Sequence, residues 1–159
     1  AAPAWWLAGC DAHPRRLRYA AGGRVPVALS ASRLLLDTSV LIWWLSEPDR
    51  LKPDTTALIA DPGNTISCSV VNLWEIQIKS RLGKLDLAMP LSAIHDWIVD
   101  QEGWELLPVH WAHIRRLDAL PSPHKDPFDR LLIAQALEEQ LSLVSVDEQV
   151  RRYPLDVVG

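Results

Sequence analysis

Short apolar runs alternate with longer amphipathic stretches along the chain from Arg33 onward. The first run, Leu34–Asp37, consists of three leucines that end abruptly in a carboxylate. An uninterrupted apolar run of this length is typical of a strand buried on both faces, as in a parallel sheet. Similar runs predict further strands at residues 65–67, 105–107 and 143–145, with an edge strand at 156–158.

Between these runs, apolar residues recur at the spacing of helix faces. Helices are predicted over residues 40–45, 54–60, 70–82, 91–100, 110–120, 128–140 and 147–152. Thr38 and Ser39 are expected to cap the first of them. Asp54 and Ser69 are expected to cap the next two, because short polar side chains accept hydrogen bonds from the free N–H groups at helix starts. Strands that alternate with helices predict an α/β fold, a three-layer α/β/α arrangement around a mostly parallel central sheet.

Residues 1–32 depart from this pattern. They are rich in Ala, Arg, Gly and Pro, and their prolines and Gly22-Gly23 interrupt any long element. We expect a poorly ordered N-terminal extension that contributes no chemistry. The remaining residues, 33–159, suit a single domain with a proper hydrophobic core.

Charge and cysteine content narrow the classes of protein. The net charge is −4, and residues 1–32 hold four Arg and one Asp, so the acidic excess lies in the predicted domain. An acidic domain argues against a large generic DNA-binding surface. Cys10 and Cys68 fit neither a zinc site nor a disulfide framework, which indicates a reducing cytoplasm. No apolar run approaches the roughly 18 to 20 residues of a membrane helix, so no membrane association is expected.

Four acidic residues recur where predicted strands end or helices begin: Asp37, Glu75, Asp129 and Asp147. Open α/β sheets place their ligand sites at the carboxyl ends of the strands. We expect the four side chains to converge on a divalent cation such as Mg²⁺ or Mn²⁺, because hard cations take oxygen ligands and crowded carboxylates need a positive charge. In phosphodiester hydrolysis such a metal orients a water, lowers its pKa and stabilises charge on the phosphate.

Asp37 and Glu75, together with the neighbouring Asp126, also have purely structural interpretations, and Asp147 could likewise be merely a helix cap. Asp37 is placed to cap the following helix. Glu75 stands four residues before Lys79, the favoured order for an ion pair on a solvated helix face. Asp126 precedes Pro127 and can cap the helix that begins there, since proline is favoured at the first helical position.

Basic and aromatic residues near the acids leave two interpretations open. Five cations either meet RNA or DNA phosphates at the rim of a cleft or form an ordinary solvated face: Lys79, Arg81, Lys84, Lys125 and Arg130. His124 is a candidate general acid or phosphate contact, although loop histidines are more often simply exposed. For Trp43-Trp44 we favour an apolar groove for a second subunit over base stacking.

Four stretches combine these features: LLLDTSVLIWWL from Leu34, SVVNLWEI from Ser69 with Lys79 beyond it, HKDPFDRLLIAQA from His124, and LVSVD from Leu143. Together they resemble the motifs of PIN domains, as found in VapC-type toxins of bacterial toxin–antitoxin pairs. The third stretch is the most specific. The resemblance covers about residues 33–158 and leaves the N-terminal extension outside.

The resemblance implies an Mg²⁺-dependent endoribonuclease toxin that a cognate antitoxin holds inactive and that forms a homodimer. It assigns the catalytic acids as Asp37, Glu75, Asp129 and Asp147, with Asp37 and Asp129 as direct metal ligands. Asp126, Thr38 and Ser39 have supporting roles. RNA is the implied substrate, and Mn²⁺ is an alternative metal.

Two rival classes of protein can be distinguished from a PIN-type ribonuclease. Haloacid-dehalogenase-like phosphatases also place an Asp after a buried first strand, but they need a second Asp two positions on, where this chain has Ser39. A catalytically silent PIN-like module would bind RNA or a protein partner without cleavage. Loss of one of the four acids would favour the silent module, and none is lost.

Overall fold

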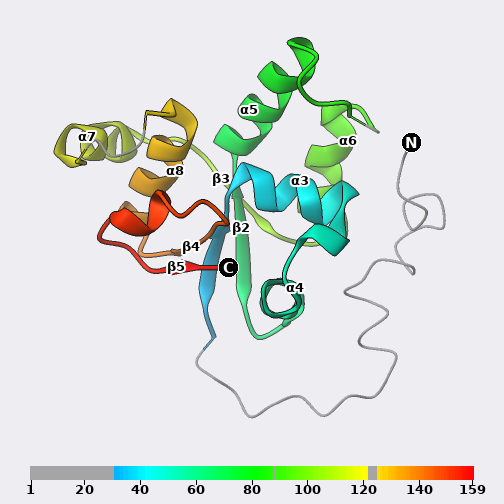
Figure 1. Cartoon of the computed structure of the whole chain (residues 1–159), viewed down its shortest axis with the longest axis horizontal. Coiled ribbons are helices and arrows are strands. Elements are labelled where there is room, and N and C mark those ends of the chain that lie inside the picture. Colours follow the sequence, from blue (N-terminus) through cyan, green and yellow to red (C-terminus); the bar gives the residue numbers. More distant parts are fainter. Residues whose placement is uncertain (1–30, 88, 122–124) are drawn as a thin grey trace.

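The computed structural model describes residues 31–87, 89–121 and 125–159. Five parallel strands form one central sheet in the order β3-β2-β1-β4-β5 (Figure 1). The strands are β1 Arg33–Leu36, β2 Thr65–Ser69, β3 Glu105–Leu107, β4 Ser142–Val144 and β5 Val157–Val158. The predicted strands are confirmed, and every pairing among them is parallel.

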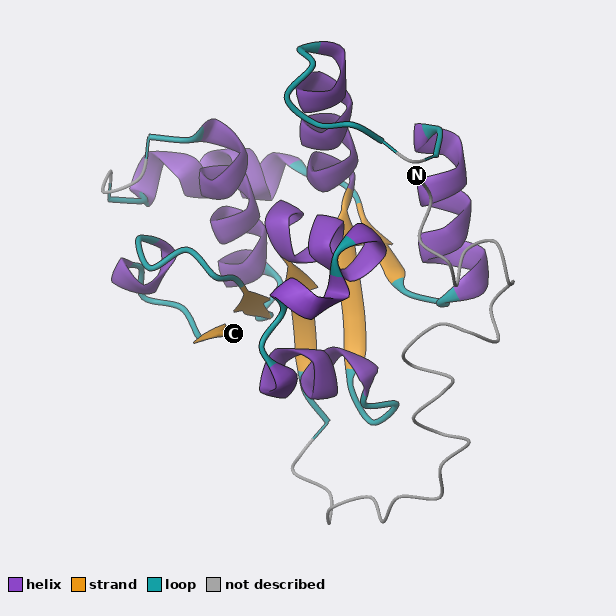
Figure 2. Ribbon diagram, turned by 45° about the vertical axis from the view of Figure 1, so that its right-hand side comes forward, coloured by secondary structure: helices purple, strands orange, loops and turns teal. Residues whose placement is uncertain are grey.

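Six α-helices in the described ranges cover both faces of the sheet (Figure 2). They are α3 Thr38–Ser46, α4 Pro53–Ala60, α5 Val70–Arg81, α6 Leu91–Asp96, α7 Trp111–Ala119 and α8 Pro127–Glu138. The expected three-layer α/β/α fold is confirmed. The helix predicted over 91–100 ends at Asp96 and continues as the π-helical turn η3 Trp97–Gln101, and residues 147–152 contain only the 3-10 turn η4 Val150–Arg152.

The leucines of β1 alternate between two hydrophobic layers. Leu34 and Leu36 are buried in a layer with residues of α3, α4 and α6, and Leu35 is buried in the opposite layer with residues of α8. Because successive side chains of a strand point to opposite faces, three consecutive leucines supply both layers. Full burial of a leucine contributes about 1.5–3 kcal/mol to the stability of the folded protein. The three leucines therefore anchor β1 at the centre of the sheet.

The order of the strands reverses at β1. From β1 the chain first builds outward through β2 and β3, then returns to place β4 on the other side of β1. Ligands bind at such a reversal point, outside the carboxyl ends of the strands. The N–H of Asp37 donates to the carbonyl of Val144 at 3.0 Å and extends the β1–β4 ladder to this edge.

The structure confirms the predicted caps of α5 and α8 but not that of α4. Ser69 caps α5 and Asp126 caps α8, each accepting a backbone N–H at the start of its helix. Asp54 lies inside the first turn of α4, because the helix already begins at Pro53. The N-cap position there is Lys52, which makes no capping hydrogen bond with its side chain.

The predicted subunit groove is wrong for Trp44 and stays a prediction for Trp43. Trp44 is fully buried, and its ring lies 6.0 Å from that of Trp104, which in turn contacts Trp97 at 5.5 Å. Trp43 is partly buried, and the guanidinium of Arg50 lies 4.2 Å from its ring centroid. Trp44, Trp97 and Trp104 therefore fill the layer between α3 and the sheet, and Trp43 lies at the surface beside that layer.

The described domain begins before β1. Ser32 donates its N–H to Asn64 at 2.9 Å and accepts the N–H of Thr65 at 2.9 Å. Residues 1–30, including Cys10, lie outside the described part, so the predicted extension stays a prediction. Cys68 is free and buried, and burial raises the pKa of its thiol. Within the described ranges, no helix has the length and apolar character needed to cross a membrane.

Candidate active site

Asp37 sits at the carboxyl end of β1 and also begins α3. Its side chain is 7% exposed, and one carboxylate oxygen accepts the N–H of Val40 at 2.7 Å. The backbone N–H of Ser39 also bonds to this carboxylate. Asp37 is thus the cap of α3, while Thr38 and Ser39 lie within the helix, so the expectation that these two cap it is wrong.

The environment of Asp37 disfavours its charged form. Burial raises the pKa of Asp37, and the nearby charge of Glu75 raises it further. Hydrogen bonds from the Ser145 hydroxyl and from the N–H groups of Val40 and Ser39 act in the opposite direction. Burial dominates, so the ionised carboxylate is held in place at an electrostatic cost that a nearby cation would offset.

Glu75 is buried on α5 even though its ion-pair partner is accessible. The residue is 3% exposed, and one of its carboxylate oxygens, Oε1, lies 2.6 Å from the Lys79 Nζ atom. Its other oxygen, Oε2, is buried and has no hydrogen-bond partner among the described residues. The predicted Glu–Lys pair is confirmed, but the solvated-face interpretation is wrong for Glu75. A buried carboxylate oxygen without a partner costs about 1–3 kcal/mol or more, which marks this position for a ligand.

Ser145 connects Asp37 to the segment that carries Asp147. Its hydroxyl bonds to the Asp37 carboxylate and accepts the N–H of Asp147 at 3.1 Å. The Asp147 carboxylate in turn accepts the N–H of Gln149 at 2.8 Å. Sequence analysis missed Ser145; the available signal was a hydroxyl directly after β4, at the edge where Asp37 follows β1.

Asp129 lies in the first turn of α8, behind its cap Asp126. The preceding residue, Phe128, contacts Trp74 edge to face, with ring centroids 5.1 Å apart and planes at 78°. Trp74 directly precedes Glu75 on α5. Glu75 and Asp129 therefore each directly follow one of two aromatic residues that contact each other.

Asn72 is a second residue that sequence analysis missed. Its fully buried amide donates to the Leu36 carbonyl at 3.2 Å and to the Thr38 hydroxyl at 3.1 Å. Its oxygen accepts the N–H of Ser69 at 2.6 Å. Asn72 thereby ties the end of β1 and the hydroxyl of Thr38 to the start of α5, and the predicted supporting role of Thr38 stays a prediction. A polar residue within an apolar helix start was the only signal.

Comparison with known proteins identifies the family. Residues 34–155, most of the chain, match the family described as the PIN domain. The chain belongs to the PIN domain family. This PIN domain is 28% identical over 128 residues to Ribonuclease VapC22 of Mycobacterium tuberculosis (strain ATCC 25618 / H37Rv), a match that covers 78% of the chain and 95% of the relative.

Two solved structures share the fold of this PIN domain. One is VapBC2 from Rickettsia felis bound to a DNA fragment from their promoter, with a TM-score of 0.57 and 18% identity over 79% of this chain and 97% of that chain. The other is FitAcB from Neisseria gonorrhoeae, with a TM-score of 0.52 and 16% identity over 79% of this chain and 96% of that chain.

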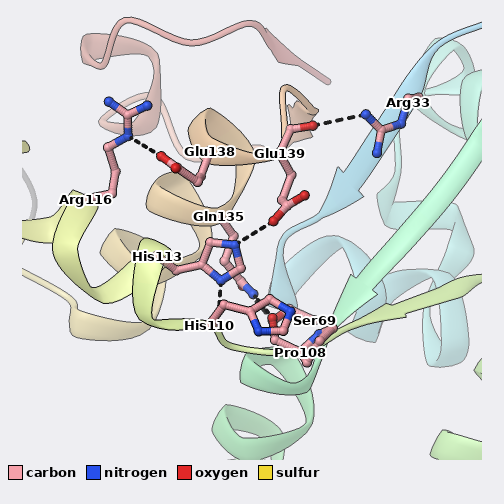
Figure 3. A network of polar contacts seen from close by, with 9 residues as sticks. All are labelled: Arg33, Ser69, Pro108, His110, His113, Arg116, Gln135, Glu138 and Glu139. Atoms are coloured by element: carbon pink, nitrogen blue, oxygen red, sulfur yellow. Dashed lines mark hydrogen bonds and ion pairs between the residues drawn. The ribbon is translucent and has the colours of Figure 1, made fainter.

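A network of hydrogen bonds holds α8 of the PIN domain in place (Figure 3). The Ser69 hydroxyl bonds to the Gln135 side-chain oxygen at 2.6 Å, and the Gln135 amide donates to the Pro108 carbonyl at 3.1 Å. His113 is fully buried between a backbone N–H at 3.0 Å and the Glu139 carboxylate at 2.8 Å. These bonds attach α8, which carries Asp129 at its start, to α7 and to the ends of β2 and β3.

The predicted rim cations differ in their surroundings. Arg130 donates to the Pro121 carbonyl at 2.8 Å and to the Leu117 carbonyl at 3.4 Å, so its guanidinium joins α8 to the end of α7. Arg81, Lys84 and Lys125 are exposed. His124 lies outside the described residues, and its predicted role stays a prediction.

The residues present fit the divalent cation that a PIN domain implies. Within the described ranges, no three His, Cys, Asp or Glu side chains form a ready-made metal cluster. Two buried carboxylates, Asp37 and Glu75, nevertheless lie close enough to interact electrostatically, and one Glu75 oxygen lacks a partner among the described residues. Such a donor set suits a hard cation with carboxylate ligands. The convergence of all four acids on it stays a prediction.

Proposed function

We propose that this PIN domain is the ribonuclease toxin of a toxin–antitoxin pair and hydrolyses RNA phosphodiester bonds with Mg²⁺, or Mn²⁺, in its acidic site. The observation that carries the proposal is the buried pair of carboxylates, Asp37 and Glu75, at the reversal point of the sheet. Similarity to Ribonuclease VapC22 over nearly all of that protein supports the same activity. An enzyme that acts on cellular RNA belongs in the cytoplasm.

Asp37 and Asp129 would hold the metal, with Glu75 and Asp147 completing the acidic site. When bound, the cation supplies a water of lowered pKa and stabilises charge on the phosphate. The chain's own part is to hold the carboxylates ready. Asp37 accepts hydrogen bonds from two backbone N–H groups and from Ser145, so its side chain has little freedom to lose on binding.

A homodimer has support in an exposed apolar face. Val70 and Trp74 lie four residues apart on α5, and Trp111 and Ile114 lie three apart on α7, so each pair shares one side of its helix. All four are exposed, Trp111 by 75%. We propose that a second copy of the chain covers the exposed pair on α7, since exposed apolar clusters mark interaction sites.

A cognate antitoxin is the second protein partner in this proposal. The two structures that share the fold are VapBC2 bound to DNA and FitAcB. The antitoxin would inhibit the toxin, and its removal would expose the acidic site to RNA.

The test is cleavage of a pool of cellular RNAs by the purified protein, with Mg²⁺ or with EDTA. Wild type is compared with Asp37→Asn and Asp129→Asn, and with Asp100→Asn as a matched control, because Asp100 is an exposed acid on η3. We expect cleavage that needs the metal, persists in the control and is lost in both site variants. Cleavage by the site variants would refute the site. Metal binding by wild type without cleavage would favour the silent binding module.

A further inference from the structure

The Glu75–Lys79 ion pair is unequally buried. The Glu75 side chain is 4% exposed and the Lys79 side chain 39% exposed, and their charged atoms lie 2.6 Å apart. In an ordinary surface pair on a helix both side chains would be solvated. Here the ammonium reaches inward from the surface to a carboxylate inside the candidate metal site.

Lys79 neutralises this site incompletely. It engages one oxygen of Glu75 and leaves the other buried without a partner among the described residues. Asp37 adds a second buried carboxylate close by. In the described part of the chain, Lys79 is the one cation that forms an ion pair with either acid. Of the two buried carboxylates, only Glu75 is paired with this cation.

The Lys79 side chain is partly exposed, whereas the two acids are buried. Lys79 ends in a compact ammonium on a flexible four-carbon stem, and its side chain is 39% exposed. Asp37 is held by several hydrogen bonds, and Glu75 is packed inside the protein. A divalent cation that binds beside Glu75 would compete with the ammonium for the Glu75 carboxylate, and the ammonium is the partner with a path to solvent.

We propose that Lys79 is a positioning residue that takes the place of the metal beside Glu75 in the metal-free protein and, when the metal binds, releases Glu75 and contacts an RNA phosphate. This inference rests on the proposed ribonuclease function. In the metal-free protein the lysine balances the buried acids. In the loaded protein it supplies positive charge at the mouth of the site, where phosphates are positioned by Lys and Arg.

The first readout is metal affinity without RNA, measured by titrating full-length protein with Mn²⁺ and following free Mn²⁺ by electron paramagnetic resonance. The variants are Lys79→Met and Lys79→Gln, the second of which keeps a hydrogen-bond donor for Glu75. Lys52→Met is the matched control, because Lys52 is an exposed lysine that is not among the five candidate rim cations. We expect both Lys79 variants to bind Mn²⁺ about three- to tenfold more tightly, on the scale of one ion pair lost as a competitor, and the control to bind as wild type does.

The second readout is affinity for a single-stranded RNA oligonucleotide in saturating Ca²⁺ over a series of salt concentrations. The plot of log affinity against log salt concentration has a negative slope. The loss of one phosphate contact makes this slope shallower by about 0.7. We expect this loss in both Lys79 variants and not in Lys52→Met. If the Glu75–Lys79 ion pair were merely structural, its loss would lower the stability of the Lys79 variants. Neither their Mn²⁺ affinity nor their salt slope would then change in this way.

Each outcome decides a different claim. Unchanged or weaker Mn²⁺ binding in both Lys79 variants would overturn the inference and leave the proposed function intact. Tighter Mn²⁺ binding with an unchanged salt slope would overturn the phosphate contact. Absence of Mn²⁺ binding by wild type, with all variants folded, would overturn the proposed metal-dependent function itself.

Discussion

The ring of Phe128 meets the indole of Trp74 edge to face, with centroids 5.1 Å apart. Each of these aromatic residues directly precedes an acid of the candidate site, so this contact between α5 and α8 helps to set the relative position of Glu75 and Asp129. Aromatic pairs of this geometry contribute about 0.5–1.5 kcal/mol beyond area burial.

The Phe128→Ala variant tests this coupling. We expect the free energy of unfolding to fall by about 1–3 kcal/mol, because a partly buried ring and its aromatic contact are lost. RNA cleavage should fall by more than the unfolded fraction explains. Urea unfolding and single-turnover cleavage measure the two effects, with Phe128→Tyr as the variant that keeps the ring. Equal cleavage by Phe128→Ala and wild type would show that this contact does not position the acids.

Stability of the metal-free protein should depend on pH through Asp37. Its folded-state pKa is raised above the ordinary value of 3.8, chiefly by burial. A raised pKa contributes stability that is complete below the ordinary value and is lost as pH rises through the folded value. Asp37→Asn removes this titration, so in EDTA the variant should be more stable than wild type near pH 7 and lose its advantage near pH 3.

Urea unfolding from pH 3 to 8 in EDTA measures this difference. Addition of Mg²⁺ should stabilise wild type and not the variant, because ligand binding to the folded state adds to its stability. A constant difference between the two proteins at every pH would contradict the assigned titration.

Ser145→Ala should weaken the site without removing a charge. The change removes the hydrogen bond that Ser145 donates to the Asp37 carboxylate. It also leaves the backbone N–H of Asp147 without its acceptor. We expect the free energy of unfolding to fall by about 1–3 kcal/mol and the cleavage rate by about 10- to 100-fold. The matched control is Ser142→Ala, since Ser142 bonds to the exposed Asp156 at 2.6 Å. Equal effects of the two changes would deny Ser145 a special role.

Trp111→Glu should convert a dimer into a monomer. The residue is 75% exposed at the start of α7, so a charged side chain there is tolerated by the fold but not by an apolar interface. Light scattering after size exclusion measures the mass, and Leu82→Glu is the control because Leu82 is also exposed, at 63%, beyond the end of α5. A monomeric wild type, or a dimeric Trp111→Glu, would refute the proposed face.

The sequence predicts the architecture well because its signal is local. The three leucines of β1 and the hydroxyl of Ser69 each act on their own strand or helix, and both appear as expected. The candidate site is harder to predict. Glu75 and Lys79 read as a surface pair by spacing alone, and only packing against the sheet shows that the carboxylate is inside.

Residues that act through distant partners escape sequence analysis altogether. Asn72 bonds to Leu36 and Thr38, and Ser145 bonds to Asp37, across separations that no short pattern encodes. The same limit explains Trp44, whose burial depends on Trp104 from a different segment.

The place of β4 beside β1 has a consequence for synthesis of the chain. Leu36 pairs with Val144, which comes from near the opposite end of the sequence, and contacts between such remote segments form slowly. A chain emerging from the ribosome carries Asp37 and Glu75 long before β4 exists, and domains fold as units once their last essential strand is available. The β1–β4 edge is therefore completed only after β4 has been made, and a chain that stops before β4 contains the early acids without the strand that pairs with β1.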